Sequence, residues 1–195
     1  MADYTAIVEA GNALVELLRA QLTPEPLANR DTIALCSPYE SAAHQLTVHL
    51  YHIEEENHSM TSGYGTVGQT LQRRSPVQML LRYLVTAHSQ APVPLREADQ
   101  HRIIGAAIQT VRDYPVIPMQ YLSGSLAEER AQLHILMERV PMEHMLKMWN
   151  QTTKDYKLSF VVQMTGVNIA SKRERTISRV TDLTVQTRPI SGGGL

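Results

Sequence analysis

A length of 195 residues, a hydrophobic content of 43% and a charged content of 19% indicate one ordinary soluble globular domain. The net charge of −1 gives no general case for nucleic-acid binding, and the single cysteine, Cys36, excludes an internal disulfide bond. The sequence has no apolar run of the roughly 18 residues that a membrane-spanning helix needs. Its N-terminus also lacks the basic and apolar blocks of a signal peptide. We therefore expect a cytoplasmic protein that binds no nucleic acid and does not insert into a membrane.

The first part of the chain predicts one helix, two strands and a long loop. Apolar residues recur at helical spacing over residues 4–22, and the Thr23-Pro-Glu-Pro sequence that follows ends the helix. Residues 32–36 predict a short strand. Apolar and polar residues alternate over residues 45–53, which predicts a strand with one solvent-exposed face. Residues 54–75 are polar and include three glycines, so we expect a long loop there.

An apolar segment in the middle of the chain predicts the centre of a sheet. Residues 77–85 form a nearly continuous apolar run with one charge, Arg82, which is typical of a central strand covered on both faces. Residues 96–111 then place apolar side chains such as Ile104 at helical spacing, and Pro115 stops the helix soon afterwards. We expect this helix to pack against the central strand.

The last regular elements are two strands with a helix between them. Residues 132–140 and 158–164 predict the strands, and Pro141 suits the first turn of a helix that includes Met145 and Trp149. Strands separated by single helices and hairpins predict an α+β fold. We expect one domain over residues 1–169, with a mixed, mostly antiparallel sheet packed by about three helices.

Residues 170–195 differ in character from this domain and predict an extended C-terminal arm. Over residues 171–188 there are five basic and two acidic side chains, and the apolar residues show neither a helical nor a clean strand period. The arm is either a frayed terminus or a segment that orders on a partner, for example by adding a strand. The candidate protein-interface residues are Arg73, Arg74, Lys172, Arg173, Arg175 and Arg179.

One motif resembles a cofactor site in its letters alone. Gly63, Gly65 and Gly68 match the G-x-G-x-x-G fingerprint of dinucleotide-binding proteins. That fingerprint needs a strand before it and a helix after it, whereas polar residues precede it here and Pro76 follows too soon. We expect a mobile glycine loop and no bound cofactor.

Four histidines lie close together in the sequence, beside the glutamates at positions 54–56. They are His44, His49, His52 and His58. A metal site needs ligands that converge on one point, and two residues three apart on a strand point to opposite faces unless a bulge intervenes. We therefore expect a solvated polar face and no bound metal.

Two further positions suggest structural roles. Cys36 follows a predicted strand and has no glycine turn beside it that could donate hydrogen bonds to an oxyanion, so we expect a structural thiol. Ser125 and Glu128 have the spacing of a capping box at a helix N-terminus. No catalytic constellation is present, and we expect that the protein is not an enzyme.

Several segments, in order, resemble one known family. They are residues 2–26, 33–38 (IALCSP), 46–53, 73–89, 95–115, 124–150 and 156–169. Together they resemble the cap, or tail-terminator, proteins of phage-tail-like extracellular contractile injection systems of the antifeeding-prophage and Photorhabdus virulence cassette type. The resemblance lies in the amino-acid sequences of successive segments and not in a single signature motif.

The resemblance implies a structural function. It implies a homo-hexameric ring that ends polymerisation of the tube, the sheath or both, with tube and sheath proteins as partners in a phage-tail-like particle. It implies no catalytic residue and no cofactor. The alternative is a small protein-binding adaptor domain that is not part of a tail. The size of the protein in solution distinguishes the two, because a cap forms rings or co-purifies with sheath.

Overall fold

The computed structural model describes residues 2–39, 43–56, 63–67, 71–150 and 155–176. The chain divides into two compact units. The main unit comprises residues 1–60 and 76–170, and the small unit comprises residues 61–75 and 171–195. Each unit therefore combines two separate segments of the chain, and those of the small unit are far apart in the sequence.

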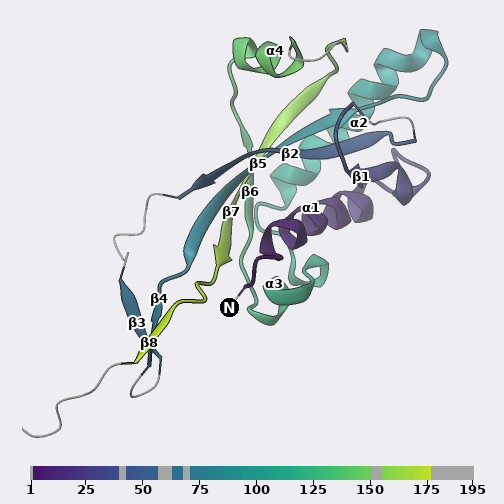
Figure 1. Ribbon diagram of the computed structural model, residues 1–195. Helices are drawn as coiled ribbons and strands as arrows, with labels where there is room; N and C mark the ends of the chain where they lie inside the picture. The colour runs from purple at the N-terminus through teal and green to yellow at the C-terminus, as the bar shows by residue number, and fades with distance from the viewer. Residues whose placement is uncertain (1, 40–42, 57–62, 68–70, 151–154, 177–195) are drawn as a thin grey trace, which may run out of the picture. The chain divides into compact units, whose positions relative to one another are not determined.

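The main unit is built on a five-stranded sheet with the strand order β1-β2-β5-β7-β6 (Figure 1). Its strands are β1 (Ile33–Leu35), β2 (Leu46–Glu55), β5 (Val77–Ala87), β6 (His134–Glu138) and β7 (Ser159–Ile169). β1 and β2 pair in parallel, and all the other neighbours are antiparallel. β5 occupies the middle of the sheet, which confirms the prediction of a central strand.

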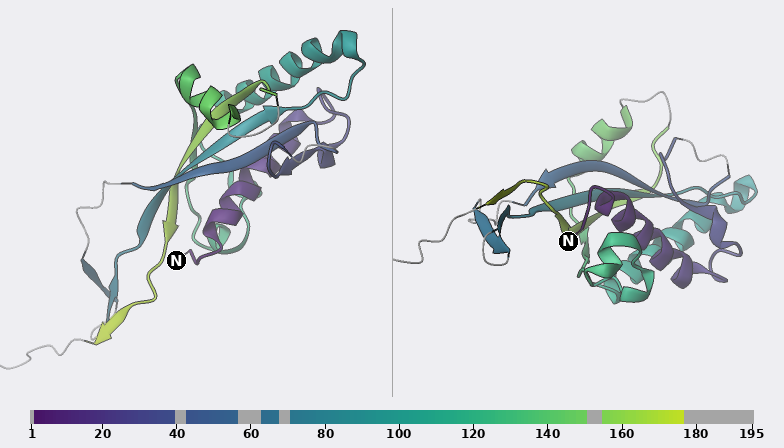
Figure 2. Two further views of the ribbon diagram at one scale, coloured as in Figure 1. Left: turned by 45° about the horizontal axis from the view of Figure 1, so that its top comes forward. Right: turned by 60° about the horizontal axis from the view of Figure 1, so that its bottom comes forward.

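Helices cover both faces of this sheet. α1 (Ala6–Leu22), α2 (Arg96–Asp113) and the short α3 (Gly124–Glu128) lie on one face, and α4 (Met142–Asn150) lies on the other (Figure 2). Three 3-10 turns, η1 (Arg30–Thr32), η2 (Val93–Leu95) and η3 (Met119–Tyr121), lie between these elements. The arrangement confirms an α+β fold with a mixed, mostly antiparallel sheet.

Alternation along β5 explains why both of its faces are covered. Tyr83 and Val85 belong to the large core shared with α1 and α2, whereas Leu84 packs with Met145 and Trp149 of α4. Burial of each large apolar side chain contributes roughly 1.5–3 kcal/mol. The methionine-containing helix α4 therefore packs on the sheet, as its sequence predicts.

The alternation of β2 predicts one solvent-exposed face along the whole strand. This prediction is wrong at the start of β2, where both faces are buried. Thr47 is fully buried, and its hydroxyl oxygen lies 2.9 Å from Nε2 of the buried His88. Lys157 Nζ lies 2.9 Å from Nδ1 of the same ring. An ammonium group can only donate, so Nδ1 accepts and Nε2 donates to Thr47. Burial, together with the nearby Lys157 and His44, lowers the pKa of His88 to about 4, which keeps the ring neutral.

Two bulges interrupt the ladders of β5. In β2 the pairing shifts between Leu50 and His52, so Tyr51 is the extra residue. In β7 a corresponding shift includes Gly166, which has a φ of 88°. A Cβ atom at Gly166 would collide with the backbone carbonyl oxygen of Gln132, so this position requires glycine for both conformation and space.

The N-terminus of α3 is capped from another helix. The predicted capping box of Ser125 and Glu128 is wrong, because the N-cap residue is Ser123 and its side chain makes no capping bond. Instead, Glu9 of α1 accepts hydrogen bonds from the backbone nitrogen of Leu126 at 3.0 Å and from Ser125 Oγ at 2.8 Å. A carboxylate at this position also suits the positive end of a helix.

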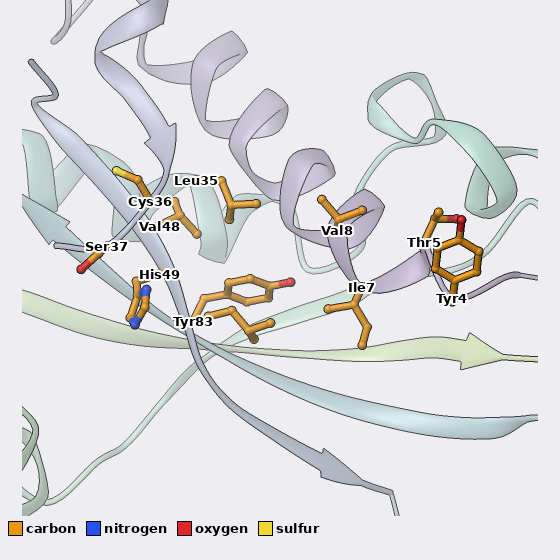
Figure 3. Close-up of a pocket in the computed structure, with 11 residues that line it drawn as sticks. Tyr4, Thr5, Ile7, Val8, Leu35, Cys36, Ser37, Val48, His49 and Tyr83 are labelled. Atoms are coloured by element: carbon orange, nitrogen blue, oxygen red, sulfur yellow. The ribbon is translucent and has the colours of Figure 1, made fainter. Parts of the chain in front are cut away.

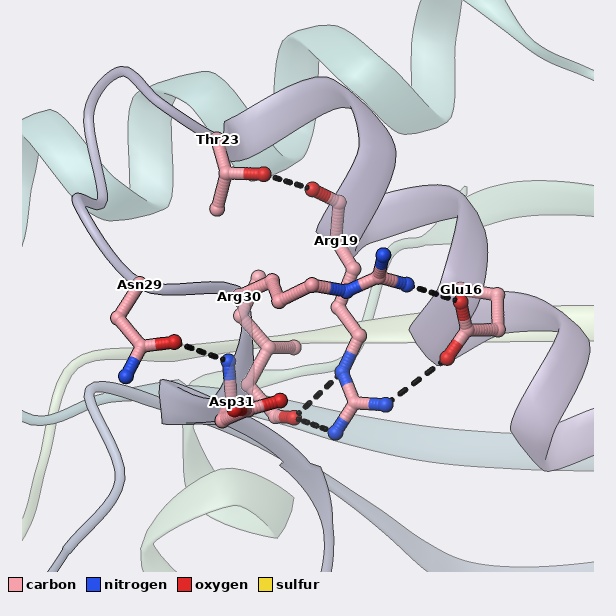
Figure 4. A network of polar contacts seen from close by, with 7 residues as sticks. Glu16, Arg19, Thr23, Asn29, Arg30 and Asp31 are labelled. Atoms are coloured by element: carbon pink, nitrogen blue, oxygen red, sulfur yellow. Dashed lines mark hydrogen bonds and ion pairs between the residues drawn. The ribbon is translucent and has the colours of Figure 1, made fainter.

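The edge of the sheet at β1 is closed by a side chain. Arg19 of α1 donates from Nε (3.0 Å) and Nη2 (2.7 Å) to the carbonyl oxygen of Ile33. Glu16 holds the same guanidinium at 2.8 Å and also pairs with Arg30 at 2.7 Å (Figure 4). An edge carbonyl that is already bonded offers less of a template for another strand.

The small unit contains a three-stranded antiparallel sheet with the order β3-β4-β8. Its strands are β3 (Tyr64–Val67), β4 (Leu71–Arg74) and β8 (Glu174–Thr176). The predicted loop over residues 54–75 is therefore wrong in two respects, since β2 continues to Glu55 and two strands follow it. The sequence does not predict these strands, because neither of their faces is apolar enough to show a clear alternation of apolar and polar residues.

Candidate interaction site

The small sheet brings together most of the basic residues that the sequence singles out as an interface. Arg73 and Arg74 lie on β4, and Arg175 lies on β8, with Lys172 and Arg173 just before it. More than 95 residues separate the two groups in the chain. Arg179, the sixth candidate, lies outside the described residues. The described residues of the small unit include these five cations and a single carboxylate, Glu174.

The strand register assigns these side chains to two faces. Gln72 of β4 pairs with Arg175 of β8, and Arg74 pairs with Tyr64 of β3. Arg74 N donates to the carbonyl oxygen of Arg173 at 3.1 Å, which continues the same register by one residue. Residues that face each other across strands, and residues two apart along a strand, share a face. Arg74, Arg173 and Arg175 therefore lie on one face, which we call the cationic face.

The opposite face of the small sheet contains an ion pair. Arg73 and Glu174 are directly opposed across β4 and β8 and form an ion pair between their side chains. Leu71 and Thr176 form the next pair on this face. Opposite charges at facing positions support the pairing of two strands. Arg73 is thus paired with a carboxylate within the chain, and no carboxylate among the described residues of the small unit lies on the other face.

Neighbouring side chains hold one guanidinium of the cationic face in position. Arg175 Nε donates to Gln72 Oε1 at 2.9 Å, and its guanidinium carbon lies 4.1 Å from the centre of the Tyr64 ring. A guanidinium over a tyrosine ring is attracted by the negative face of that ring. Neither contact occupies the two terminal nitrogens of Arg175 with a hydrogen bond, and Arg74, Arg173 and Arg175 are all exposed.

The main unit has an apolar groove that sequence reasoning missed. It has a volume of about 440 Å³ and lies between the start of α1 and strands β1, β2 and β5 (Figure 3). Val8 and Leu35 border it, and the buried Tyr83 contributes a hydroxyl that makes no hydrogen bond with the described residues. Burial raises the pKa of Tyr83. No sequence signal marks this groove, because its lining comes from four separate elements.

The histidine-rich segment does not form a ligand cluster in the part of the chain that the structure describes. The bulge at Tyr51 brings His49 and His52 to the same side of β2, so the predicted opposition of these two rings is wrong. His52 Nε2 lies 3.6 Å from Glu54 Oε2. Among the described residues, however, no group of three His, Cys, Asp or Glu side chains could hold a metal ion. His58 lies outside the described residues. The absence of a bound metal remains a prediction.

The described part of the glycine motif lies in or beside a strand of an antiparallel pair and not at a strand-to-helix turn. Gly65 is part of β3, which pairs with β4, and Gly68 lies outside the described residues. The expected mobile loop is therefore wrong for the described part of the motif. Cys36 is a half-buried cysteine outside any disulfide bond, and it directly follows β1. Within the described ranges, no helix has both the length and the apolar character needed to cross a bilayer.

Comparison with known proteins identifies the family. Residues 9–182 match the Pvc16 N-terminal domain. This chain belongs to the Pvc16 N-terminal domain family. The match spans both units described above, and it confirms the family resemblance drawn from the sequence segments.

Two solved structures share the fold of this Pvc16 N-terminal domain. One is the PVC sheath/tube terminator of an extracellular contractile injection system in its extended state, with a TM-score of 0.68 and 14% identity over 100% of this chain and 67% of that one. The other is the anti-feeding prophage cap, described as the AFP tube terminating cap, with a TM-score of 0.64 and 18% identity. That alignment covers 92% of this chain and 61% of the cap. No curated protein matches the chain.

Proposed function

We propose that this protein is a structural cap, or tail terminator, of a contractile injection system. The observation that supports the proposal most directly is the fold: 100% of this chain aligns with a sheath/tube terminator and 92% with a tube-terminating cap. The family match over residues 9–182 points the same way. No observation in the chain favours the alternative of an adaptor domain.

The physical task of a terminator fits a protein without catalytic residues. A stacking polymer exposes an unpaired face at its end, and a subunit that matches this face without reproducing it stops growth. Closed symmetry then limits the number of copies. We propose a homo-hexameric ring that contacts the tube, the sheath or both, and that is neither an enzyme nor a cofactor-binding protein.

We further propose that the basic residues of the small unit and of residues 170–195 contact the partner, while residues 1–169 supply the folded ring domain. The described start of the arm includes β8, and the five described basic candidates lie in the small sheet or just before its strand β8. We infer that the protein folds in the cytoplasm, binds no nucleic acid, inserts into no membrane, and becomes part of a phage-tail-like particle.

The test is assembly with tube and sheath proteins, with and without this protein. With it, we expect particles of uniform length that have a six-fold ring at one end; without it, we expect a broad length distribution because growth is not stopped. Electron microscopy measures both. Particles of unchanged length in its absence, or another symmetry at the capped end, would contradict the proposal.

A further inference from the structure

We propose that the cationic face of the small sheet, formed by Arg74, Arg173 and Arg175, is a docking surface for a carboxylate-rich protein face. The inference rests on the proposed cap function and deepens it, because it names one face of one sheet and the chemistry of its partner. Arg73, although basic and adjacent in sequence, is excluded from this surface by its ion pair with Glu174.

Repulsion between arginines of the cationic face is the first argument for a docking surface. The register places Arg74 and Arg173 directly opposite each other, nearer to one another than diagonal neighbours on the sheet are, and Arg175 lies two residues farther on the same face. Like charges at facing positions destabilise a strand pair. No carboxylate among the described residues of the small unit lies on this face, since Glu174 points to the other one. A partner that supplies carboxylates would relieve this repulsion.

The second argument is that the side chain of Arg175 is already held in position before a partner binds. The exposed Arg175 is held by a hydrogen bond from its Nε atom to Gln72 and by the contact of its guanidinium with the Tyr64 ring, and neither of these contacts uses its two terminal nitrogens as hydrogen-bond donors. Two parallel N–H donors match the two oxygens of a carboxylate. Three arginines on neighbouring strands also lie on backbone that is hydrogen-bonded on both sides of β4. Arg175 would therefore lose little side-chain freedom when a partner binds here.

The number of cations favours a protein over a nucleic acid. Proteins that bind duplex DNA through its backbone commonly neutralise about 6–10 phosphates. The cationic face has three arginines, and the full chain has a net charge of −1, so its long-range field does not attract a polyanion. Three arginines can each pair with one carboxylate, which suits a local acidic patch on another protein. The positive charge of the cationic face is complementary to such a patch.

The experiment uses the full chain and two matched variants. The first variant reverses the cationic face with Arg74→Glu, Arg173→Glu and Arg175→Glu. The second exchanges the ion pair on the opposite face with Arg73→Glu and Glu174→Arg, which keeps the net charge. A third variant with glutamine at positions 74, 173 and 175 is used if charge reversal lowers the melting temperature. Binding to a fluorescent poly-glutamate peptide is measured at low and high salt, as is incorporation into particles.

We expect the reversed or glutamine variant to bind poly-glutamate about tenfold more weakly, or worse, and to enter particles poorly. The exchanged pair should behave like the wild type, and wild-type binding should weaken with salt. The inference would be overturned if the exchanged-pair variant lost as much poly-glutamate binding as the reversed variant, or if the reversed variant entered particles as well as the wild type. Tighter binding of duplex DNA than of poly-glutamate would also overturn it.

The outcomes separate this inference from the cap function. If the wild type limits particle length and the reversed variant does so equally well, the cap function stands and the inference fails. If the wild type does not limit length, yet poly-glutamate binding still depends on Arg74, Arg173 and Arg175, the cap function fails and the acidic-partner surface is supported.

Discussion

Glu9 and Leu126 connect the first turn of α1 to the first turn of α3 across 117 residues of sequence, through a hydrogen bond of 3.0 Å from the Leu126 backbone nitrogen. Ser125 adds a second bond to the same carboxylate oxygen. Gly124, which has a φ of 56°, completes the contact because a Cβ atom there would collide with the Glu9 carboxylate. One side chain thus satisfies donors at the start of a helix too short to be stable by itself.

We predict that Glu9→Gln lowers the free energy of unfolding by about 1 kcal/mol at neutral pH, since a charged cap is replaced by a neutral one. Burial raises the pKa of Glu9, but the hydrogen bonds from Thr5, Leu126 and Ser125 outweigh it and lower the pKa below 4.5. The stabilisation is therefore present above pH 4.5 and is lost as the pH falls through the lowered value. Urea denaturation at several pH values measures this.

The control for Glu9 is Glu97→Gln, at an exposed position in the first turn of α2. It should change stability by less than about 0.5 kcal/mol. An equal loss in both variants, or an acid dependence that Glu9→Gln leaves unchanged, would show that the contact with Leu126 contributes nothing specific.

The sequence predicts elements whose own side chains determine their environment. β5 and α4 are examples: the apolar run before Ala87 needs cover on two faces, and Met145 and Trp149 on one side of a short helix cover one of them. The sequence does not predict relations that depend on tertiary contact. Glu9 as the cap of α3 has no local signature, and neither does the separation of Arg73 from Arg74 onto opposite faces, because both depend on which distant strand or helix lies alongside.

Substitution of Leu81 should test the central position of β5. Leu81 is fully buried in the large core, so Leu81→Asp places an unpaired charge there at a cost of several kcal/mol and should unfold the domain. Leu95→Asp is the control, because Leu95 is 60% exposed and should tolerate the charge. Circular dichroism and the melting temperature distinguish the two. A Leu81→Asp protein that melts like the wild type would place the core elsewhere.

Gly166→Ala should destabilise the fold by more than about 2 kcal/mol. The substitution adds a methyl group where the carbonyl oxygen of Gln132 already lies, at a φ of 88° that alanine rarely adopts. The matched control is Gly105→Ala in the middle of α2, where a Cβ atom meets nothing within 4 Å. That change should raise stability by up to about 1 kcal/mol. Thermal unfolding of both variants should therefore give shifts of opposite sign, and shifts of the same sign would contradict the bulge geometry.

Arg19→Met should cost about 1–2 kcal/mol, because the edge carbonyl of Ile33 loses two charged donors. Arg30→Met removes a cation from the same network, but Arg30 is 60% exposed and bonds only to Glu16 there, so its loss should stay below about 0.5 kcal/mol. Chemical denaturation measures both values. Size-exclusion chromatography of Arg19→Met adds a second readout, since an unbonded edge at β1 favours self-association. Equal effects of the two substitutions would argue against a special role for the Ile33 contact.

Tyr83→Phe tests the hydroxyl at the base of the apolar groove. The side chain is fully buried, and its hydroxyl makes no hydrogen bond with the described residues, so removing it should leave stability unchanged or raise it by up to about 1 kcal/mol. Tyr39→Phe is the matched control, because Tyr39 donates to the carbonyl oxygen of Met148 at 3.3 Å and its loss should cost roughly 0.5–1.5 kcal/mol. Differential scanning calorimetry of the two variants gives the comparison directly. A loss of more than about 1 kcal/mol in Tyr83→Phe would mean that the hydroxyl is hydrogen-bonded in solution. In that case the groove holds a polar group against Tyr83, and the apolar description of its base would have to be abandoned.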